Sequence, residues 1–398
     1  MANRRVDSAL YNALDRSDPP ASLEEIQSIV DADHGASTRY VLVENRQTPL
    51  FRACLCEFAR IDVIFYLIEQ WPQSVHMPDV NGDLPIHASC LYGLDFAIVK
   101  KLVSHFPESV GKQASDSETP LHLAARPLCS NSGPSLELVN FLYQRYPDAI
   151  QVRNDAGFLP IHHAVLSSDN SGERDQMIRF LAKASPRSLL AGDNDGDLPL
   201  HIACGCGLSL SAVQFLVELE PQSLTRRNHN GDLPLNFALL DKESPLEKLD
   251  YLLGMHQNFN DPAILHRCYQ KNSSGSPLVV QYLIQRFPLC VKVQDEHGRI
   301  PLHKATQMHV WERHDAVIKH AHVQALVGAY PRGLFVRANN DKTPLEALLN
   351  QQYAYLEETR ELMEEKLRDI LTVSLKGIAE KFNVPEEVLV LSVVQYVV

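Results

Sequence analysis

Apolar side chains gather along this chain in short clusters that recur at nearly regular intervals. Each cluster opens with a four-residue frame, in which the second residue is proline, the third is apolar and the fourth is most often histidine. Nine frames begin at residues 48, 84, 119, 159, 198, 233, 263, 300 and 343, with 30 to 43 residues between successive starts. The copy at 263 lacks the proline. A period in this range is typical of proteins built from stacked repeats.

The residues that follow each frame predict a pair of helices. The sixth frame position is Ala, Ser or Cys in every repeat except the last, which lets neighbouring first helices approach closely. The second segment has apolar residues at helical spacing, as in Ile98, Val99, Leu102 and Val103. Proline is expected to end this second helix, because it lacks the N–H donor and clashes with the preceding turn. Seven such prolines each lie twelve residues before the next frame: Pro72, Pro107, Pro147, Pro186, Pro221, Pro288 and Pro331.

The constant segment between this proline and the next frame predicts a tight turn. Five repeats place glycine two residues before the frame, at Gly82, Gly157, Gly196, Gly231 and Gly298. The same repeats carry Asp or Asn three residues earlier, at Asp79, Asn154, Asp193, Asn228 and Asp295. Glycine tolerates positive φ, and Asp and Asn favour turns through their side-chain oxygens. We therefore expect a short hairpin-like turn in front of each first helix.

The Thr-Pro-Leu-His-x-Ala frame, the helix pair and the Asp-x-x-Gly turn together resemble the ankyrin repeat over residues 36–350. Leu or Ile replaces Thr in five frames, and proline replaces the family's usual glycine turn after the second helix. The resemblance implies an all-α solenoid of stacked helix-turn-helix units. It also implies an N-terminal capping unit at 1–47, a repeat array at 48–345, a helical C-terminal cap at 346–398, and a concave binding face of turn tips and first helices. The degenerate repeat predicts an irregular stack near 241–275.

Composition adds limits on partners and location. The chain has 398 residues, 45% of them hydrophobic, and a net charge of −12. An acidic chain gains no counterion release from phosphate backbones, so basic peptides or protein faces are expected as partners instead of nucleic acid. No apolar run reaches about 18 residues and the first residues do not form a signal sequence, so we expect an intracellular protein, cytoplasmic or nuclear, without a membrane span. The oligomeric state stays open.

Histidines and cysteines are the candidates for chemistry. Six histidines share the fourth frame position: His87, His122, His162, His201, His266 and His303. Packed helices lie about 8–10 Å apart, whereas a zinc–nitrogen bond measures about 2 Å, so we expect neutral imidazoles that bond to backbone across repeats. The alternative function is a metal-binding or enzymatic protein that uses the histidine-rich insert 307–322 or the cysteine pairs 54/56 and 204/206. No catalytic motif is present, so we predict no enzyme, cofactor or metal.

An acidic row immediately before the frames is the candidate binding site: Asp83, Glu118, Asp197 and Asp232. Arg299 has the same position in a later repeat, and Tyr92 and Phe158 are candidate apolar anchors on the same face. The acids either cap the first helices and meet their dipoles, or recognise a basic ligand. We predict a non-catalytic scaffold that binds another protein along the concave face. A further hypothesis makes the apolar segment 388–398 a docking helix for an oligomer or another domain.

Overall fold

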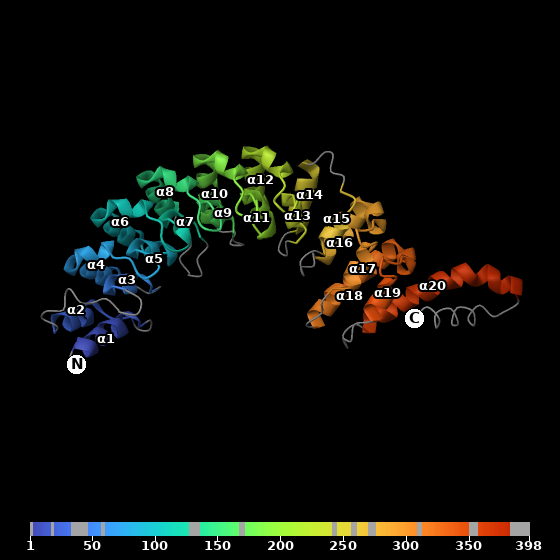
Figure 1. Ribbon diagram of the computed structural model, residues 1–398, viewed down its shortest axis with the longest axis horizontal. Helices are drawn as coiled ribbons and strands as arrows, with labels where there is room; N and C mark the ends of the chain where they lie inside the picture. The colour runs from blue at the N-terminus through green and yellow to red at the C-terminus, as the bar shows by residue number, and fades with distance from the viewer. Residues whose placement is uncertain are drawn as a thin grey trace. The chain divides into compact units, whose positions relative to one another are not determined.

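The computed structural model describes residues 3–16, 20–32, 47–56, 60–126, 136–166, 172–240, 245–255, 261–269, 276–308, 313–349 and 357–382. Every regular element in these residues is a helix, which confirms the all-α prediction (Figure 1). The chain divides into two compact blocks, residues 1–234 and residues 235–398, called here the first and second block. None of the described helices has the length and apolar content that crossing a membrane requires.

The first block consists of consecutive helix pairs in two rows. Its helices are α1 (Asn3–Leu14), α2 (Leu23–Asp31), α3 (Pro49–Cys54), α4 (Ile61–Gln70), α5 (Pro85–Leu91), α6 (Phe96–His105), α7 (Pro120–Ala125), α8 (Leu136–Arg145), α9 (Pro160–Val165), α10 (Gly172–Ala184), α11 (Pro199–Gly205) and α12 (Leu210–Leu219). Helices α3, α5, α7, α9 and α11 contact one another in sequence, and so do α4, α6, α8, α10 and α12. The core lies between the two rows, where Leu102, Leu181 and Leu216 are buried.

The second block repeats this pairing with more variation. Its helices are α13 (Pro234–Ala238), which starts at the last residue of the first block, α14 (Pro245–Met255), α15 (Ile264–Arg267), α16 (Pro277–Arg286), α17 (Pro301–Thr306), α18 (Arg313–Ala329), α19 (Pro344–Leu349) and α20 (Glu357–Phe382). Helix α16 contacts α14 and α18, and α17 contacts α15 and α19. The segment that was expected to cap the C-terminus therefore includes a long helix, α20, which packs on α18 and α19.

Each helix-ending proline also begins a short 3-10 helix. These are η1 (Pro72–His76), η2 (Pro107–Gly111), η4 (Pro147–Gln151), η5 (Pro186–Leu190), η6 (Pro221–Thr225), η7 (Pro288–Lys292) and η8 (Pro331–Phe335), with η3 (Ser115–Ser117) inside a turn. The residue before the proline leaves helical geometry, as Phe106 does at φ −140° and ψ 80°. The proline thus ends the second helix, as expected, and its fixed φ suits the first position of the new turn.

The frame histidine caps the first helix of its own repeat. In five frames its Nδ1 atom accepts a hydrogen bond from the backbone N–H of the first frame residue, for example Leu198 N to His201 Nδ1 at 3.0 Å. A glutamate performs this role in a usual capping box, and Glu346 does so in the last repeat, where it accepts from Thr343 N at 2.7 Å. Where leucine replaces threonine, the N–H of the fourth frame residue, which Thr48 Oγ1 accepts in the first frame, donates instead to the carbonyl of the first frame residue, as His201 N does to Leu198 O at 2.9 Å.

The other ring nitrogen of the same histidine reaches the next repeat. Five Nε2 atoms bond a backbone carbonyl in the segment before the following frame: His87 with Lys112, His122 with Phe158, His201 with Asp232, His266 with Val293 and His303 with Lys342, at 2.8–3.1 Å. A backbone N–H on Nδ1 and a carbonyl on Nε2 require a neutral ring that carries its proton on Nε2. Burial lowers the pKa of all six frame histidines, to about 4 for His122 and His162. The predicted backbone bonds between repeats are confirmed at these five histidines, and the pair of bonds that requires a neutral ring is present at His87, His122, His201 and His303.

Two long second helices, α10 and α18, carry a buried basic side chain at the repeat position that holds the N-cap residue of the shorter second helices. Twelve residues before the helix-ending proline, three repeats place a capping side chain: Asp95, Ser209 and Ser276. Helices α10 and α18 begin earlier, and the same position holds Arg174 or Lys319, both buried. Arg174 Nη1 donates to Ala164 O and Lys319 Nζ to Met308 O, each at 3.0 Å. Burial lowers the pKa of Lys319 to about 7. Each cation meets the carbonyl end of its repeat's first helix.

The degenerate repeat has the shortest first helix. Without the frame proline, α15 covers only Ile264–Arg267. The backbone N–H of Ala263, just before this helix, donates to Asp261 Oδ1 at 2.9 Å. The Nδ1 atom of His266 has no hydrogen-bond partner, in contrast to the intact frames. The repeat at 263 thus differs from the intact repeats in its first helix and its cap, whereas much of the range 241–275, for which an irregular stack was expected, lies outside the described residues. The apolar segment 388–398 and a helix expected from Asn383 onward lie outside the described residues.

The histidine ladder predicts that acid destabilises the protein well before most carboxylates are protonated. The unfolded chain binds protons on histidine near pH 6.5, whereas His122 binds one only near pH 4 in the folded protein, so acidification across this window favours unfolding. A histidine with such a shift contributes about 3 kcal/mol at neutral pH that is lost by pH 4. Urea unfolding from pH 7.5 to 4 measures this slope.

The variant His122→Asn isolates the contribution of His122 to the pH dependence of the unfolding free energy. Asparagine occupies the same frame position naturally at Asn236, so the frame accommodates it. We expect this variant to lose less unfolding free energy than the unmodified chain between pH 6.5 and 4, because its side chain does not titrate. An unchanged slope would show that the ladder does not control the acid sensitivity.

Candidate functional site

The turn in front of each first helix is built around one Asp or Asn side chain. In the turn 154–158, Asn154 Oδ1 accepts from Ala156 N at 3.1 Å and from Phe158 N at 2.8 Å. Asn154 N donates to Phe158 O at 3.0 Å, and Gly157 N donates to Asn154 O at 2.9 Å, which closes a hairpin-like loop. The same four bonds occur in turns 79–83, 193–197, 228–232 and 295–299. The predicted turn is confirmed in all five repeats.

Successive turns are bonded to each other through the backbone. A turn donates one N–H to a carbonyl of the preceding turn: Asp155 to Asp116 at 2.9 Å, Asn194 to Ala156 at 3.1 Å and His229 to Asp195 at 2.9 Å. In the second block Asn339 donates to His297 in the same way, at 2.9 Å. The turns 79–83, 114–118, 154–158, 193–197 and 228–232 of the first block are called here the turn edge. Backbone hydrogen bonds join the last four turns of the edge to one another. The first turn, 79–83, is joined to the turn 114–118 through the side chain of Asp83.

The acids before the frames bond the next turn along the edge. Asp83 Oδ1 accepts from Ser115 Oγ at 3.1 Å, and Asp197 Oδ1 accepts from Asn228 Nδ2 at 2.7 Å. Asp232 is half-buried, and its backbone carbonyl accepts from His201. The bonds of Asp83 and Asp197 cross between repeats, so helix capping does not account for them. They brace neighbouring turns, a role that neither sequence interpretation included.

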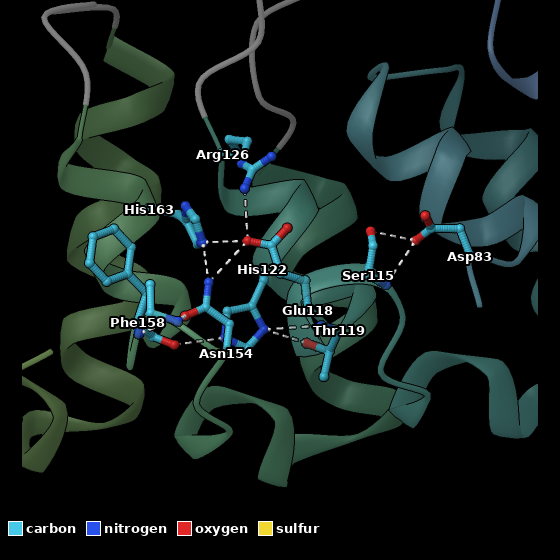
Figure 2. A network of polar contacts seen from close by, with 10 residues as sticks. Asp83, Ser115, Glu118, Thr119, His122, Arg126, Asn154, Phe158 and His163 are labelled. Carbon is cyan, nitrogen blue, oxygen red and sulfur yellow. Dashed lines mark hydrogen bonds and ion pairs between the residues drawn. The ribbon is translucent and has the colours of Figure 1, made fainter. Parts of the chain in front are cut away.

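Glu118 has the most buried carboxylate of this row, with 3% of the residue exposed. Its Oε1 atom accepts from Arg126 Nη2 at 2.8 Å, from His163 Nε2 at 2.9 Å and from Asn154 Nδ2 at 3.1 Å (Figure 2). Burial alone would raise the pKa of Glu118, but these donors and the positive charge of Arg126 hold it below its usual value. His163 is also buried, and its Nδ1 atom has no hydrogen-bond partner. Glu118 is thus an internal clamp between two repeats.

The other three candidate residues differ in their surroundings. Phe158 is half-buried, and its ring stacks on His162 at 5.4 Å and meets the edge of His163 at 5.3 Å between centroids. Tyr92 follows α5 and is 38% exposed. Arg299 belongs to the second block, where its Nη2 atom pairs with Asp295 Oδ2 at 2.9 Å. Of the candidate residues Tyr92 is thus exposed, whereas Phe158 is half-buried and Glu118 is buried.

Exposed acids occupy the tips of the turn edge, one or two residues after the position of the turn-forming Asp or Asn. They are Asp116, Asp155 and Asp195, which belong to three consecutive turns. The sequence analysis did not select them. Their signal in the sequence was an acid inside each of these turns, at a spacing of one repeat. They carry exposed negative charge at the tips of three consecutive turns.

Long side chains that are themselves exposed brace four turns, and these contacts were not predicted from the sequence. The residue before the turn donates to the carbonyl at its glycine position: Gln113 to Ser117, Arg153 to Gly157, Arg227 to Gly231 and Arg337 to Asp341. Arg153 also donates to Gly192 O at 2.6 Å. The recognisable signal is Arg or Gln immediately before the turn. These contacts place positive charges beside the turns 154–158 and 228–232, and Arg153 also lies next to Gly192, which precedes the turn 193–197. The turn 193–197 carries the most acids of the turn edge, three aspartates.

The turn 114–118 is the one turn of the turn edge that contains no glycine; the turn 338–342 of the second block also lacks it and has Asp341 at φ 60°. Ala114 N still donates to Glu118 O and Ser117 N to Ala114 O, both at 3.0 Å. Asp116 has φ 55° and Ser117 has φ 59°, and residues with a Cβ atom pay about 1–2 kcal/mol each for left-handed geometry. Strain of this kind is concentrated at functional sites.

Two buried cysteines and two late histidines among the described residues show what surrounds these candidate groups. Burial raises the pKa of Cys54 and Cys268 to about 12, which suppresses the thiolate that metal binding and redox chemistry require. His320 Nδ1 contacts Thr359 Oγ1 at 3.3 Å, and His322 Nδ1 contacts Tyr269 Oη at 3.1 Å. Within the described part of the chain no three His, Cys, Asp or Glu side chains are grouped to hold a metal. The side chains at 309 and 314 lie outside it.

No model of a known protein family matches this chain, and no curated protein matches it. The turn edge and the hydrogen bonds between its turns are therefore the features from which a function is inferred.

Two glycine variants test how closely the turns fit together. Gly157 has φ +78°, and an added Cβ would lie 2.7 Å from Asn194 N in the next turn. Gly231 has φ +79°, but an added Cβ meets nothing within 4 Å. Gly157→Ala and Gly231→Ala share the backbone strain, and only the first also forces the turns apart. We expect Gly157→Ala to lose at least about 1 kcal/mol more unfolding free energy, measured by urea unfolding. Equal losses would show that the contact between the turns contributes no stability.

Proposed function

We propose that this chain is a non-catalytic protein-binding scaffold, an ankyrin-type solenoid that holds a partner along its turn edge. The observation that supports this proposal most is the edge itself. Its turns are bonded to one another and carry exposed acids at three consecutive tips. A surface held this rigidly loses little conformational entropy when a ligand binds.

The direct contacts are assigned to the tip residues Asp116, Asp155 and Asp195. Glu118 is internal, and Asp83 and Asp197 bond neighbouring turns, so these three acids form a second layer that holds the tips in place. Aromatic side chains that keep an accessible surface are frequent anchors in interfaces, so Tyr92 and Phe158 are expected to pack against apolar groups of the partner.

The proposed partner segment is extended and basic. Neighbouring helices pack about 8–10 Å apart, and an extended chain spans at most about 3.6 Å per residue. A cationic side chain at every third residue therefore matches successive turns. The turn 193–197 is expected to contribute most, because it carries three aspartates and is not braced by an arginine of its own. The raised pKa values of the buried cysteines favour this proposal over metal or redox chemistry.

A designed peptide tests the proposal directly. The probe is a fluorescein-labelled peptide of four Arg-Gly-Ser triplets, and its affinity is measured by fluorescence anisotropy at low salt. We expect the triple variant Asp116→Asn, Asp155→Asn, Asp195→Asn to bind about tenfold more weakly, since three exposed ion pairs of about 0.5 kcal/mol each are lost. Added salt is expected to weaken binding of the unmodified chain as well.

A matched control separates recognition from overall charge. The variant Glu108→Gln, Asp148→Asn, Glu218→Gln also removes three exposed negative charges, but these residues lie on η2, η4 and α12, away from the turn edge. Its affinity for the peptide is expected to stay within about twofold of the unmodified chain. An equal loss in both triple variants, or no binding by the unmodified chain, contradicts the proposed surface.

A further inference from the structure

Side-chain bonds link neighbouring repeats of the first block at two positions beside the first helices. The frame histidine bonds a carbonyl of the next repeat, as His122 does with Phe158 O at 3.1 Å. The acid before the frame accepts a bond from the next turn, as Asp197 does from Asn228 Nδ2 at 2.7 Å. The junctions that follow the repeats at 84, 119 and 198 contain both bonds.

Among the described residues, the junction between the repeats at 159 and 198 contains neither bond. Burial lowers the pKa of His162 to about 4, and the nearby carbonyls of Ala191 and Asp197 oppose this shift, but the buried Nε2 atom forms a hydrogen bond with neither. Phe158 replaces the acid before the frame, and Asp193, which forms the next turn, has no side-chain donor. A buried donor without an acceptor carries the full cost of its desolvation, so the junction is weakened here.

The turns of this junction are joined by bonds at their exposed tips. Asn194 N donates to Ala156 O at 3.1 Å, and Asn194 Nδ2 donates to Asp155 O at 2.8 Å. Arg153 Nη1 donates to Gly192 O at 2.6 Å. Asn194, Asp155 and Arg153 are exposed, so water competes for these bonds and each contributes less than a buried bond.

The second helices of this junction, α10 and α12, meet through Arg179. Its Nη2 atom donates to Ser211 O at 3.4 Å, and its guanidinium lies 4.5 Å from the centre of the Phe215 ring. The preceding junction has a comparable contact between second helices, the edge-to-face pair of Tyr143 and Phe180. Arg179 therefore does not replace the buried bonds that are missing beside the first helices.

The first junction of the array, between the repeats at 48 and 84, has neither the histidine nor the acid in its sequence. There the frame position of the histidine holds Phe51, which is 3% exposed and has an apolar ring. Replacing both partners of a buried bond by apolar groups costs little, whereas leaving one partner unpaired is costly. The junction after the repeat at 159 therefore carries a cost that the first junction avoids.

We propose that the contact between the repeats at 159 and 198 is a joint, at which the first block opens into two cooperative units. One unit ends with α10, and the other begins with α11 (Figure 1). Each repeat of a stacked array is stabilised chiefly by its neighbours, so an array opens first where one contact is weaker than the rest. The inference does not depend on the proposed function, although opening at this joint changes the angle between two turns of the turn edge.

Two buried cysteines report opening in repeats on either side of the joint. Cys90 of α5 and Cys204 of α11 occupy the same frame position and are 1% and 0% exposed. Both are labelled with N-ethylmaleimide in the folded full-length chain, and the rate at each residue is measured by mass spectrometry of peptides. We expect Cys204 to react at least about tenfold faster than Cys90, because the missing bonds make opening next to it easier.

A paired substitution restores one of the missing bonds. Phe158→Asp together with Asp193→Asn reproduces the pair that Asp197 and Asn228 form at the next junction. The reference is Phe158→Asp alone, which loses the same ring packing but sets two carboxylates against each other. Relative to it, the pair should slow labelling of Cys204 by about three- to tenfold and leave Cys90 unchanged. The matched control Asp193→Asn alone keeps the oxygen that forms the turn, and should change labelling by less than about twofold.

Two histidine variants test the other missing bond. His162→Asn and His201→Asn remove the same helix cap, but only the second also removes a bond between repeats. Urea unfolding of the full-length chain is followed by circular dichroism. We expect His201→Asn to shift the midpoint of the first transition at least about twice as far as His162→Asn does.

Three outcomes overturn the joint. Equal labelling rates at Cys90 and Cys204 show that the first block opens as one unit. Faster labelling of Cys204 that the paired substitution does not slow places the opening at another contact. Equal midpoint shifts for the two histidine variants show that His162 forms the same bond between repeats as His201.

Discussion

The double hydrogen bond of the frame histidine, complete at His87, His122, His201 and His303, is the interaction on which the arrangement of these repeats depends. One ring nitrogen caps the first helix of its own repeat, and the other bonds the segment that leads into the next frame. Both partners are backbone groups, so only a neutral ring serves both. The start of a helix and the approach to the following turn are therefore fixed by one side chain. The position of each turn relative to the helices follows from this contact.

The turn edge uses much of its charge for internal contacts. Asp83 and Asp197 bond the following turn, Glu118 is clamped by three donors, and Arg153 bonds two carbonyls. Such bonds between side chains and turns restrict motion that the backbone bonds alone would allow. The exposed tip acids then stand on a rigid base. This division into a structural layer and an exposed layer is the basis of the proposed binding role, which assigns the contacts to the tips instead of to the acids before the frames.

Much of the fold could be predicted from the sequence, because frame, proline and turn residues impose local geometry that tertiary packing does not override. The turn around Asn154 and the neutral state of His122 followed from such rules. The partners of the acids did not, since a carboxylate before a helix looks the same in sequence whether it caps, recognises or braces. The buried Lys319 was missed for a related reason: its position is a cap or an internal site depending on where α18 begins.

The number of residues from the helix-ending proline to the next frame stays constant although the repeats differ in length. Twelve residues separate the two in seven repeats. The extra length of the three longest repeats lies between the first helix and this proline, either in the segment between α7 and α8 or in a longer second helix, α10 or α18. Additions there leave the proline, the turn and the frame histidine unchanged. Residues can therefore be inserted there, in evolution or by loop grafting, without changing the position of the turns relative to the frames.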